Sequence, residues 1–117
     1  MANYRVGRVS QEILKEVNDI LRHEVRDPRT EGVTITDVEL TGDLQQATVY
    51  YSTLKTDDET KQETQTGLDR ATGLVRKEIG DRLTTYHTPE IEFVRDESVE
   101  HGNRIEELLN QIRNDEE

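Results

Sequence analysis

Cationic and small residues recur at helical spacing in one stretch of the second half of the chain. Its members are Arg70, Gly73, Arg76, Lys77 and Gly80. On a helical wheel of about 100° per residue, the two glycines fall opposite the apolar stripe of the same stretch, with Arg70 and Lys77 beside them. A glycine has no Cβ, so a sugar–phosphate backbone can approach it closely while neighbouring cations neutralise the phosphates. The pattern therefore predicts a helix face that binds nucleic acid.

The position of Gly73 has more than one interpretation. A glycine inside a helix costs about 0.5–1 kcal/mol relative to alanine. At a joint between two helices it also frees backbone N–H groups, which can bind an anion. Alternatively, Gly73 only eases a kink, and the cations belong to an ordinary solvated helix face. Spacing alone leaves these interpretations open.

The residue types that usually carry catalysis or bind metals form no recognisable motif in this sequence. His23, His87 and His101 have no partner at a metal-ligand spacing, and cysteine is absent. There is no glycine-rich phosphate loop and no nucleophile elbow. We therefore expect a protein that is not an enzyme, with no cofactor, no metal and no small-molecule substrate.

The charge is uneven along the chain, although the formal net charge is -11. Residues 1–29 carry six basic side chains against five acidic ones, and residues 68–83 carry four against three. Residues 90–117, in contrast, carry ten acids and three bases. The acidic excess is concentrated near the C-terminus, so the rest of the surface can be locally basic and can bind a polyanion.

The length of 117 residues, with 31% hydrophobic and 35% charged residues, is that of one modest domain. No stretch approaches the roughly 20 apolar residues needed to cross a bilayer, and no signal-peptide pattern follows the basic N-terminus. The absence of cysteine fits a reducing compartment. We expect a single, soluble, cytoplasmic and monomeric domain over 1–117 with a short acidic tail at about 114–117.

Hydrophobic periodicity predicts the elements that position the cationic face. A helix is expected over 8–25, where apolar residues recur every three or four positions, and Pro28 prevents its continuation. Two strands should then form a β-hairpin over 33–53, with a bulge near Asp37 and a turn at 42–43.

The second half of the chain predicts the rest of the fold. Thr56 and Glu59 resemble a capping box, so a helix should begin there and meet a second helical piece near Gly73. A third strand is expected over 88–94. Its inward-facing residues should be Ile91 and Phe93. A last amphipathic helix is predicted from the spacing of Ile105, Leu108, Leu109 and Ile112. Helices packed on one face of a three-stranded sheet make an α+β fold.

Four separated strings follow one another in order over nearly the whole chain. They are DPR (27–29), TITDVELTGDLQQATVYYS (34–52), ATG (71–73) and TPEIEFVRDESVEHGNRIEELL (88–109). Together they resemble bacterial ribosome-binding factor A, a small-subunit assembly factor. The resemblance implies a type II KH-like domain, α-β-β-α-kink-α-β with a three-stranded sheet, plus a C-terminal helix. In that family an A-x-G sequence stands at the kink, and Ala71, Thr72 and Gly73 match it.

The resemblance also implies a function. The protein should bind the free 30S ribosomal subunit and its 16S rRNA and assist late maturation, including processing of the 16S 5′ end, without catalysis of its own. The residues expected to contact RNA are Arg5, Arg8, Arg70, Ala71, Thr72, Gly73, Arg76, Lys77 and Arg82. Aromatic residues are too few and scattered for base stacking, so backbone contacts should dominate. The alternative is a protein–protein interaction module whose acidic C-terminal segment recruits a basic partner.

Overall fold

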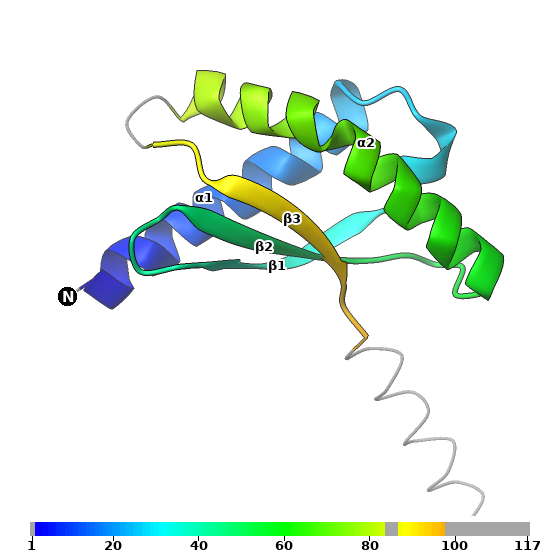
Figure 1. Ribbon diagram of the computed structural model, residues 1–117, viewed down its shortest axis with the longest axis horizontal. Coiled ribbons are helices and arrows are strands. Elements are labelled where there is room, and N and C mark those ends of the chain that lie inside the picture. Colours follow the sequence, from blue (N-terminus) through cyan, green and yellow to red (C-terminus); the bar gives the residue numbers. More distant parts are fainter. Residues whose placement is uncertain (1, 84–86, 98–117) are drawn as a thin grey trace, which may run out of the picture.

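A computed structural model describes residues 2–83 and 87–97, with the backbone alone described for residues 2–5 (Figure 1). The elements in chain order are α1 (Ala2–His23), the 3₁₀ turn η1 (Pro28–Thr30), β1 (Thr34–Leu40), β2 (Gln46–Ser52), α2 (Asp58–Arg82) and β3 (Glu90–Arg95). This order confirms the predicted α+β fold with a three-stranded sheet. The predicted C-terminal helix and the acidic tail lie outside the described residues.

α1 is an amphipathic helix whose apolar stripe packs against the sheet. Ile13, Val17 and Ile20 on this stripe are at most 1% exposed. The helix begins well before the predicted residue 8, because no proline interrupts the N-terminal residues, and it ends at His23. The turn η1 follows, where the Asp27 carboxylate caps the backbone.

The strands lie in the order β1-β2-β3, with β1 antiparallel to β2 and β2 parallel to β3. A parallel pair needs a long crossover connection, which α2 supplies. The β1–β2 register shifts between Ile35 and Asp37, which confirms the predicted bulge. In the hairpin turn Asp43 accepts a backbone hydrogen bond, but the residue with a positive φ, of 60°, is Leu44 rather than Gly42.

α2 begins at a different cap from the one predicted. The carboxylate of Asp57 accepts a hydrogen bond of 3.0 Å from the backbone N–H of Thr60. The capping box expected from Thr56 and Glu59 is therefore wrong. Aspartate is as good a cap as threonine or better, and here it lies one residue later.

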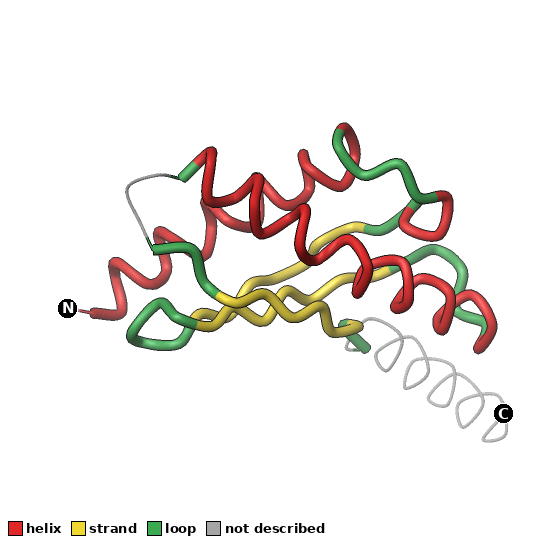
Figure 2. Tube along the Cα trace, turned by 45° about the horizontal axis from the view of Figure 1, so that its top comes forward, coloured by secondary structure: helices red, strands yellow, loops and turns green. Residues whose placement is uncertain are grey.

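The body of α2 runs unbroken from Asp58 to Arg82, whereas two pieces are predicted to meet near Gly73. Its ribbon nevertheless changes direction along its length (Figures 1 and 2). The hydroxyl of Thr72 donates to the Leu68 carbonyl oxygen at 2.9 Å, a local bond that often bends a helix, and Gly73 follows directly. The expected kink is a bend within one continuous helix.

Both helices cover one face of the sheet, α1 over β1 and α2 over β3, and within residues 2–83 and 87–97 no element covers the other face (Figure 2). Ile91 and Phe93 face the covered side, as predicted. The residues of the strands that alternate with the core and face outward include Thr36, Glu39, Thr48, Tyr50 and Glu92. The one basic residue of the three strands, Arg95, lies over the ring of Tyr51 on the covered side. The uncovered face is therefore acidic.

Candidate nucleic-acid interface

An open groove of about 370 Å³ lies along the C-terminal half of α2. It is lined by Gly73, Arg76, Lys77, Gly80, His87 and Thr88. The first four belong to the set whose spacing stands out in the sequence, and the last two belong to the segment that leads into β3. The structure thus brings residues from two parts of the chain to one surface.

Two exposed cations lie on the outer side of α2, one in the lining of the groove and one on the preceding turns of the helix. Arg70 and Lys77 are both exposed and lie two helical turns apart. Among the residues that the structure describes, neither side chain is paired with a carboxylate. Gly73 lies between them, and a Cβ built there would meet no atom within 4 Å. We call Arg70, Gly73 and Lys77 the α2 strip, which has the bare backbone and flanking charge predicted from the sequence.

Arg76 points toward the segment before β3. Its guanidinium donates to the carbonyl oxygens of Pro89 at 3.2 Å and Thr88 at 3.3 Å, and it pairs with the Glu90 carboxylate at 3.3 Å. The Arg76 side chain is still 39% exposed. It therefore holds one wall of the groove while remaining accessible from solvent.

Gly80 contacts the same segment. An ideal Cβ at Gly80 would lie 2.8 Å from the Thr88 hydroxyl oxygen, closer than real Cβ atoms approach. The expectation that both glycines face open space is therefore met by Gly73 but not by Gly80. Gly80 allows residues 87–88 to lie directly against α2.

The A-x-G triplet divides between core and surface. Ala71 is 9% exposed and belongs to the hydrophobic core. The Thr72 hydroxyl is bonded to the carbonyl of Leu68 within the helix. Of the three residues, Gly73 is the exposed one.

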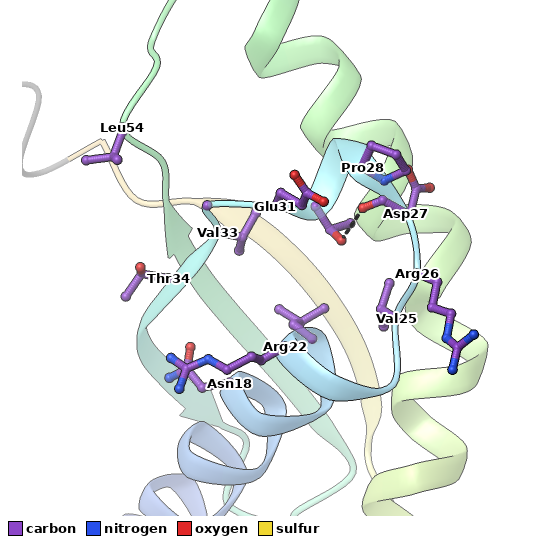
Figure 3. Close-up of a pocket in the computed structure, with 13 residues that line it drawn as sticks. Asn18, Arg22, Val25, Arg26, Asp27, Pro28, Glu31, Val33, Thr34 and Leu54 are labelled. Atoms are coloured by element: carbon purple, nitrogen blue, oxygen red, sulfur yellow. Dashed lines mark hydrogen bonds between the residues drawn. The ribbon is translucent and has the colours of Figure 1, made fainter.

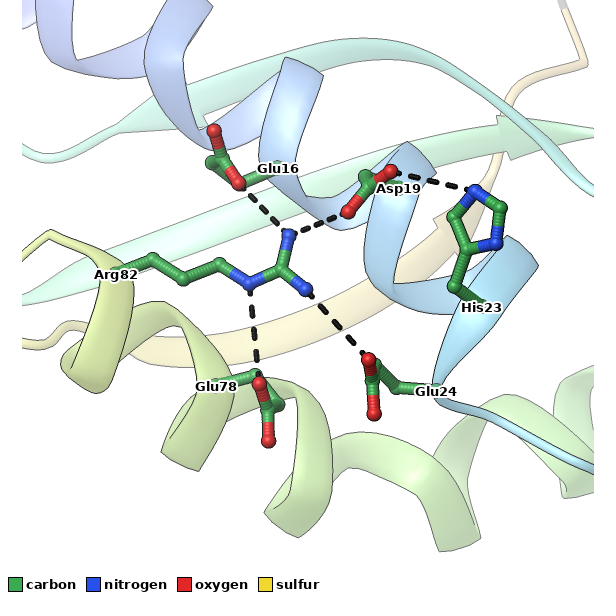
Figure 4. Close-up of polar contacts among 6 residues, drawn as sticks. All are labelled: Glu16, Asp19, His23, Glu24, Glu78 and Arg82. Atoms are coloured by element: carbon green, nitrogen blue, oxygen red, sulfur yellow. Dashed lines mark hydrogen bonds and ion pairs between the residues drawn. The ribbon is translucent and has the colours of Figure 1, made fainter.

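Arg82 joins α2 to α1 (Figure 4), and it is not among the described residues that line the groove. Its Nη1 atom contacts the carboxylates of Asp19 at 2.6 Å and Glu16 at 2.9 Å, and ion pairs to Glu78 and Glu24 complete the Arg82 cluster. Hydrogen bonds to Asp19 and Glu16 raise the pKa of Arg82, and its guanidinium holds the pKa of Asp19 below its ordinary range. Four carboxylates already balance this cation.

The two N-terminal cations lie on α1. Arg8 is exposed, and its guanidinium is 3.7 Å from the Glu12 carboxylate. Arg5 lies in the first turns of α1, where the backbone alone is described. Arg8 does not line the groove, although its neighbour Val9 shares a small cavity with His87.

A larger hollow of about 910 Å³ lies between the end of α1 and the start of β1 (Figure 3). Arg22 and Arg26 stand apart around it, and Glu31 lies among its lining residues. Beside it, Asp27 and Arg29 form an ion pair of 2.6 Å, which lowers the pKa of Asp27 to about 2. Because the cations of this hollow do not converge, we assign the candidate interface to the α2 strip and its groove.

His87 and Thr88 are the groove residues that sequence reasoning missed. Thr88 opens the last of the four matching strings and His87 belongs to none, but their place in the groove depends on the path of the chain beside α2 and not on local spacing. The available indication was Gly80, since a glycine inside a helix often marks the close approach of another segment.

Within residues 2–83 and 87–97, no three histidine or carboxylate side chains are placed to hold a metal ion. No helix in those ranges has the length and apolar character needed to cross a membrane.

Comparison with known proteins places these features in a family. The family model for ribosome-binding factor A matches residues 5–109. Ribosome-binding factor A of Enterococcus faecalis is 61% identical over 112 residues, which cover 96% of this chain and 97% of that protein.

Solved structures share the fold. The solution NMR structure of a Thermotoga maritima protein assigned to ribosome binding factor A has a TM-score of 0.71 and 39% identity, covering 81% of this chain and 90% of that one. A homology model of Thermus thermophilus ribosome binding factor A, as fitted into the cryo-EM map of a 30S complex of that factor, has a TM-score of 0.62 at 18% identity and covers 75% of this chain and 91% of that one. The sequence match and the shared fold together show that the chain belongs to the ribosome-binding factor A family.

Proposed function

We propose that this chain binds the 30S ribosomal subunit through its 16S rRNA and assists late maturation of the subunit, including processing of the 16S 5′ end. It acts as a binding protein and catalyses nothing itself. The observation that carries the proposal is the α2 strip, where Arg70 and Lys77 flank the bare backbone of Gly73. The family supports it, since the relatives are named for ribosome binding and the Thermus protein was fitted into a 30S complex.

The geometry of the α2 strip suits a sugar–phosphate backbone. Arg70 and Lys77 are separated by about 10 Å along the helix axis, so each can neutralise a different phosphate. Between them, the missing Cβ of Gly73 lets the strand lie close to the helix. These contacts depend on charge and shape and do not read base identity.

The test is co-sedimentation of the purified protein with 30S subunits and with intact 70S ribosomes over a KCl series at constant magnesium. We expect binding to 30S but not to 70S. If about four phosphates are contacted, the logarithm of affinity falls against the logarithm of salt concentration with a slope near -3 to -4. Arg70→Gln and Lys77→Gln should each flatten that slope by about 0.7–0.9. Lys55→Gln, which removes an exposed cation on the loop after β2, is the matched control.

The outcomes separate the possibilities. A slope that neither α2 variant changes contradicts the helix face, and absence of 30S binding at low salt contradicts the proposal as a whole. Loss of binding on truncation after Glu100, with the α2 variants fully active, favours the acidic interaction module instead. The role in maturation is read in cells, where Lys77→Gln should raise the fraction of 16S rRNA with an unprocessed 5′ end.

A further inference from the structure

We propose that the groove beside the α2 strip holds one phosphate of the rRNA backbone between Lys77 and His87, and that Arg76 and Gly80 are positioning residues for its wall. The inference rests on the proposed function, because the 30S subunit supplies the phosphate. It changes the role of Arg76 from a direct contact to a residue that acts through residues 87–89.

The wall is set by two contacts on successive turns of α2. Arg76 donates to the backbone carbonyls of Thr88 and Pro89 at 3.3 and 3.2 Å. One turn later, Gly80 lies so close to the Thr88 side chain that a Cβ would be 2.8 Å from its hydroxyl oxygen. Since one contact is to the backbone and the other depends on a missing side chain, together they fix the path of the segment.

The charge of the groove matches a phosphate. Lys77 and His87 are exposed on its two sides, one on α2 and one on the wall. The nearby acid Glu90 is already paired with Arg76 at 3.3 Å, so its charge is offset. A phosphate between Lys77 and His87 would meet the Lys77 ammonium group and an imidazole N–H donor, and none of the described lining residues is a carboxylate.

On the side away from the groove, His87 borders a small cavity lined mostly by apolar residues. The residues that share the cavity beneath it include Val9, Ile13, Leu40, Leu44, Ile79 and Leu83, from α1, the hairpin and the end of α2. The charged groups on the packed elements are Arg76 and Lys77 from α2 and Glu90 from β3.

The decisive variant is Gly80→Ala, because it alters the wall without changing any charge. Its affinity for purified 30S subunits should fall, and the salt slope should flatten by about 0.7–0.9, as for one lost phosphate. Gly7→Ala is the control, since it makes the same exchange in the exposed part of α1, where a Cβ meets no atom within 4 Å. The control should keep the wild-type slope.

Two further variants separate positioning from direct contact. Arg76→Lys keeps the charge but loses the planar pair of donors to the carbonyls, so it should flatten the slope as Gly80→Ala does. A direct phosphate contact would survive this exchange. His87→Asn should lower the affinity for 30S subunits, because the shorter side chain no longer reaches the phosphate in the groove.

The results distinguish this inference from the proposed function. If the wild type does not bind 30S at low salt, both fail. If Arg70→Gln flattens the slope while Gly80→Ala, Arg76→Lys and His87→Asn all behave like the wild type, the proposed function stands and the phosphate groove is wrong. Should Gly80→Ala fail to fold by circular dichroism, Arg76→Lys and His87→Asn decide the question.

Discussion

Three glycines of α2 have different surroundings although they share one helix. A Cβ at Gly67 would lie 3.0 Å from the Cβ of Arg29 and 3.2 Å from Cγ2 of Thr30. At Gly80 it would meet the wall of the groove, and at Gly73 it would meet nothing. Gly67 therefore seats η1 against α2, Gly80 admits the segment before β3, and Gly73 leaves a bare surface. The helix keeps these weak helix formers because two of them allow other segments to pack closely.

This contrast predicts opposite effects of alanine on stability. Gly73→Ala should raise the free energy of unfolding by about 0.5–1 kcal/mol, the usual helix gain, while lowering 30S affinity because the new methyl group occupies the α2 strip. Gly67→Ala should lower the free energy of unfolding. Its new methyl group would overpack against the buried Thr30 at a cost of about 1–3 kcal/mol, which outweighs the gain in helix propensity. Urea denaturation measures both values. Equal stabilisation by the two exchanges would contradict the close contact at Gly67, and full 30S affinity of Gly73→Ala would contradict close approach at Gly73.

For single residues, the sequence predicts the position of a side chain around its own helix better than it predicts contacts with distant parts of the chain. A helical wheel places Gly73 among cations, and the structure agrees, because that arrangement depends on one helix alone. The contacts of Gly67 and Gly80 come from segments elsewhere in the chain, which leave no trace in local spacing. Arg82 shows the same limit. The sequence predicts that it contacts RNA, whereas in the structure it pairs with Glu16 and Asp19 of α1.

Between elements, the Arg82 cluster ties the end of α2 to α1. Arg82→Gln should lower the urea midpoint at neutral pH, because the four carboxylates of the cluster then repel one another without a cation. The lowered pKa of Asp19 gives the sign of the pH effect. The stabilisation from the ionised Asp19 is complete above the ordinary aspartate pKa of about 3.9, and it is lost as pH falls through the lower pKa of Asp19 in the folded protein. The difference in urea midpoint between wild type and Arg82→Gln should therefore become smaller below about pH 4.

The same variant tests the role of Arg82 in binding. Because four carboxylates surround it, Arg82→Gln should leave the salt slope for 30S unchanged when the folded protein is assayed, as Lys55→Gln does. A slope flattened by a full contact, about 0.7–0.9, would return Arg82 to the set of RNA-binding residues expected from the sequence.

The types and order of the elements could be predicted because apolar periodicity is local. The bulge in β1 was visible as a phase shift between the pair Val33 and Ile35 and the pair Val38 and Leu40. The first and last residues of the helices are harder to predict from the sequence. Continuation of α2 through Gly73 depends on the packing of its buried residues against β3, η1 and α1, and this packing outweighs the cost of one glycine.

In the part of the chain that the structure describes, the cations of the α2 strip and the acids of the outward sheet face lie on opposite sides. The α2 strip carries Arg70 and Lys77, whereas the outward residues of the three strands include Glu39 and Glu92 and no basic side chain. The net charge of -11 is thus compatible with a polyanion partner, because only one side needs to face it. Composition alone could not reveal this, since the order of charges along the chain does not say which face each occupies.

A pair of charge reversals tests this arrangement. Glu63→Lys and Glu92→Lys change the net charge equally, but Glu63 is exposed two turns before Arg70 on α2 and Glu92 is on the sheet. Glu63→Lys should steepen the 30S salt slope by about 0.7–0.9 for one added contact, and Glu92→Lys should leave it unchanged. Equal steepening by both variants would show that total charge, and not its placement, controls binding.

The acidic outward face of the sheet has a further consequence for the orientation in which the molecule approaches RNA. Because the α2 strip is locally cationic while the outward strand residues on the other face are acidic, the field of the proposed RNA surface should favour an approach with the strip first. In that orientation the acidic outward residues of the strands, such as Glu39 and Glu92, are directed away from the RNA. The described part of the chain is therefore expected to bind in one orientation.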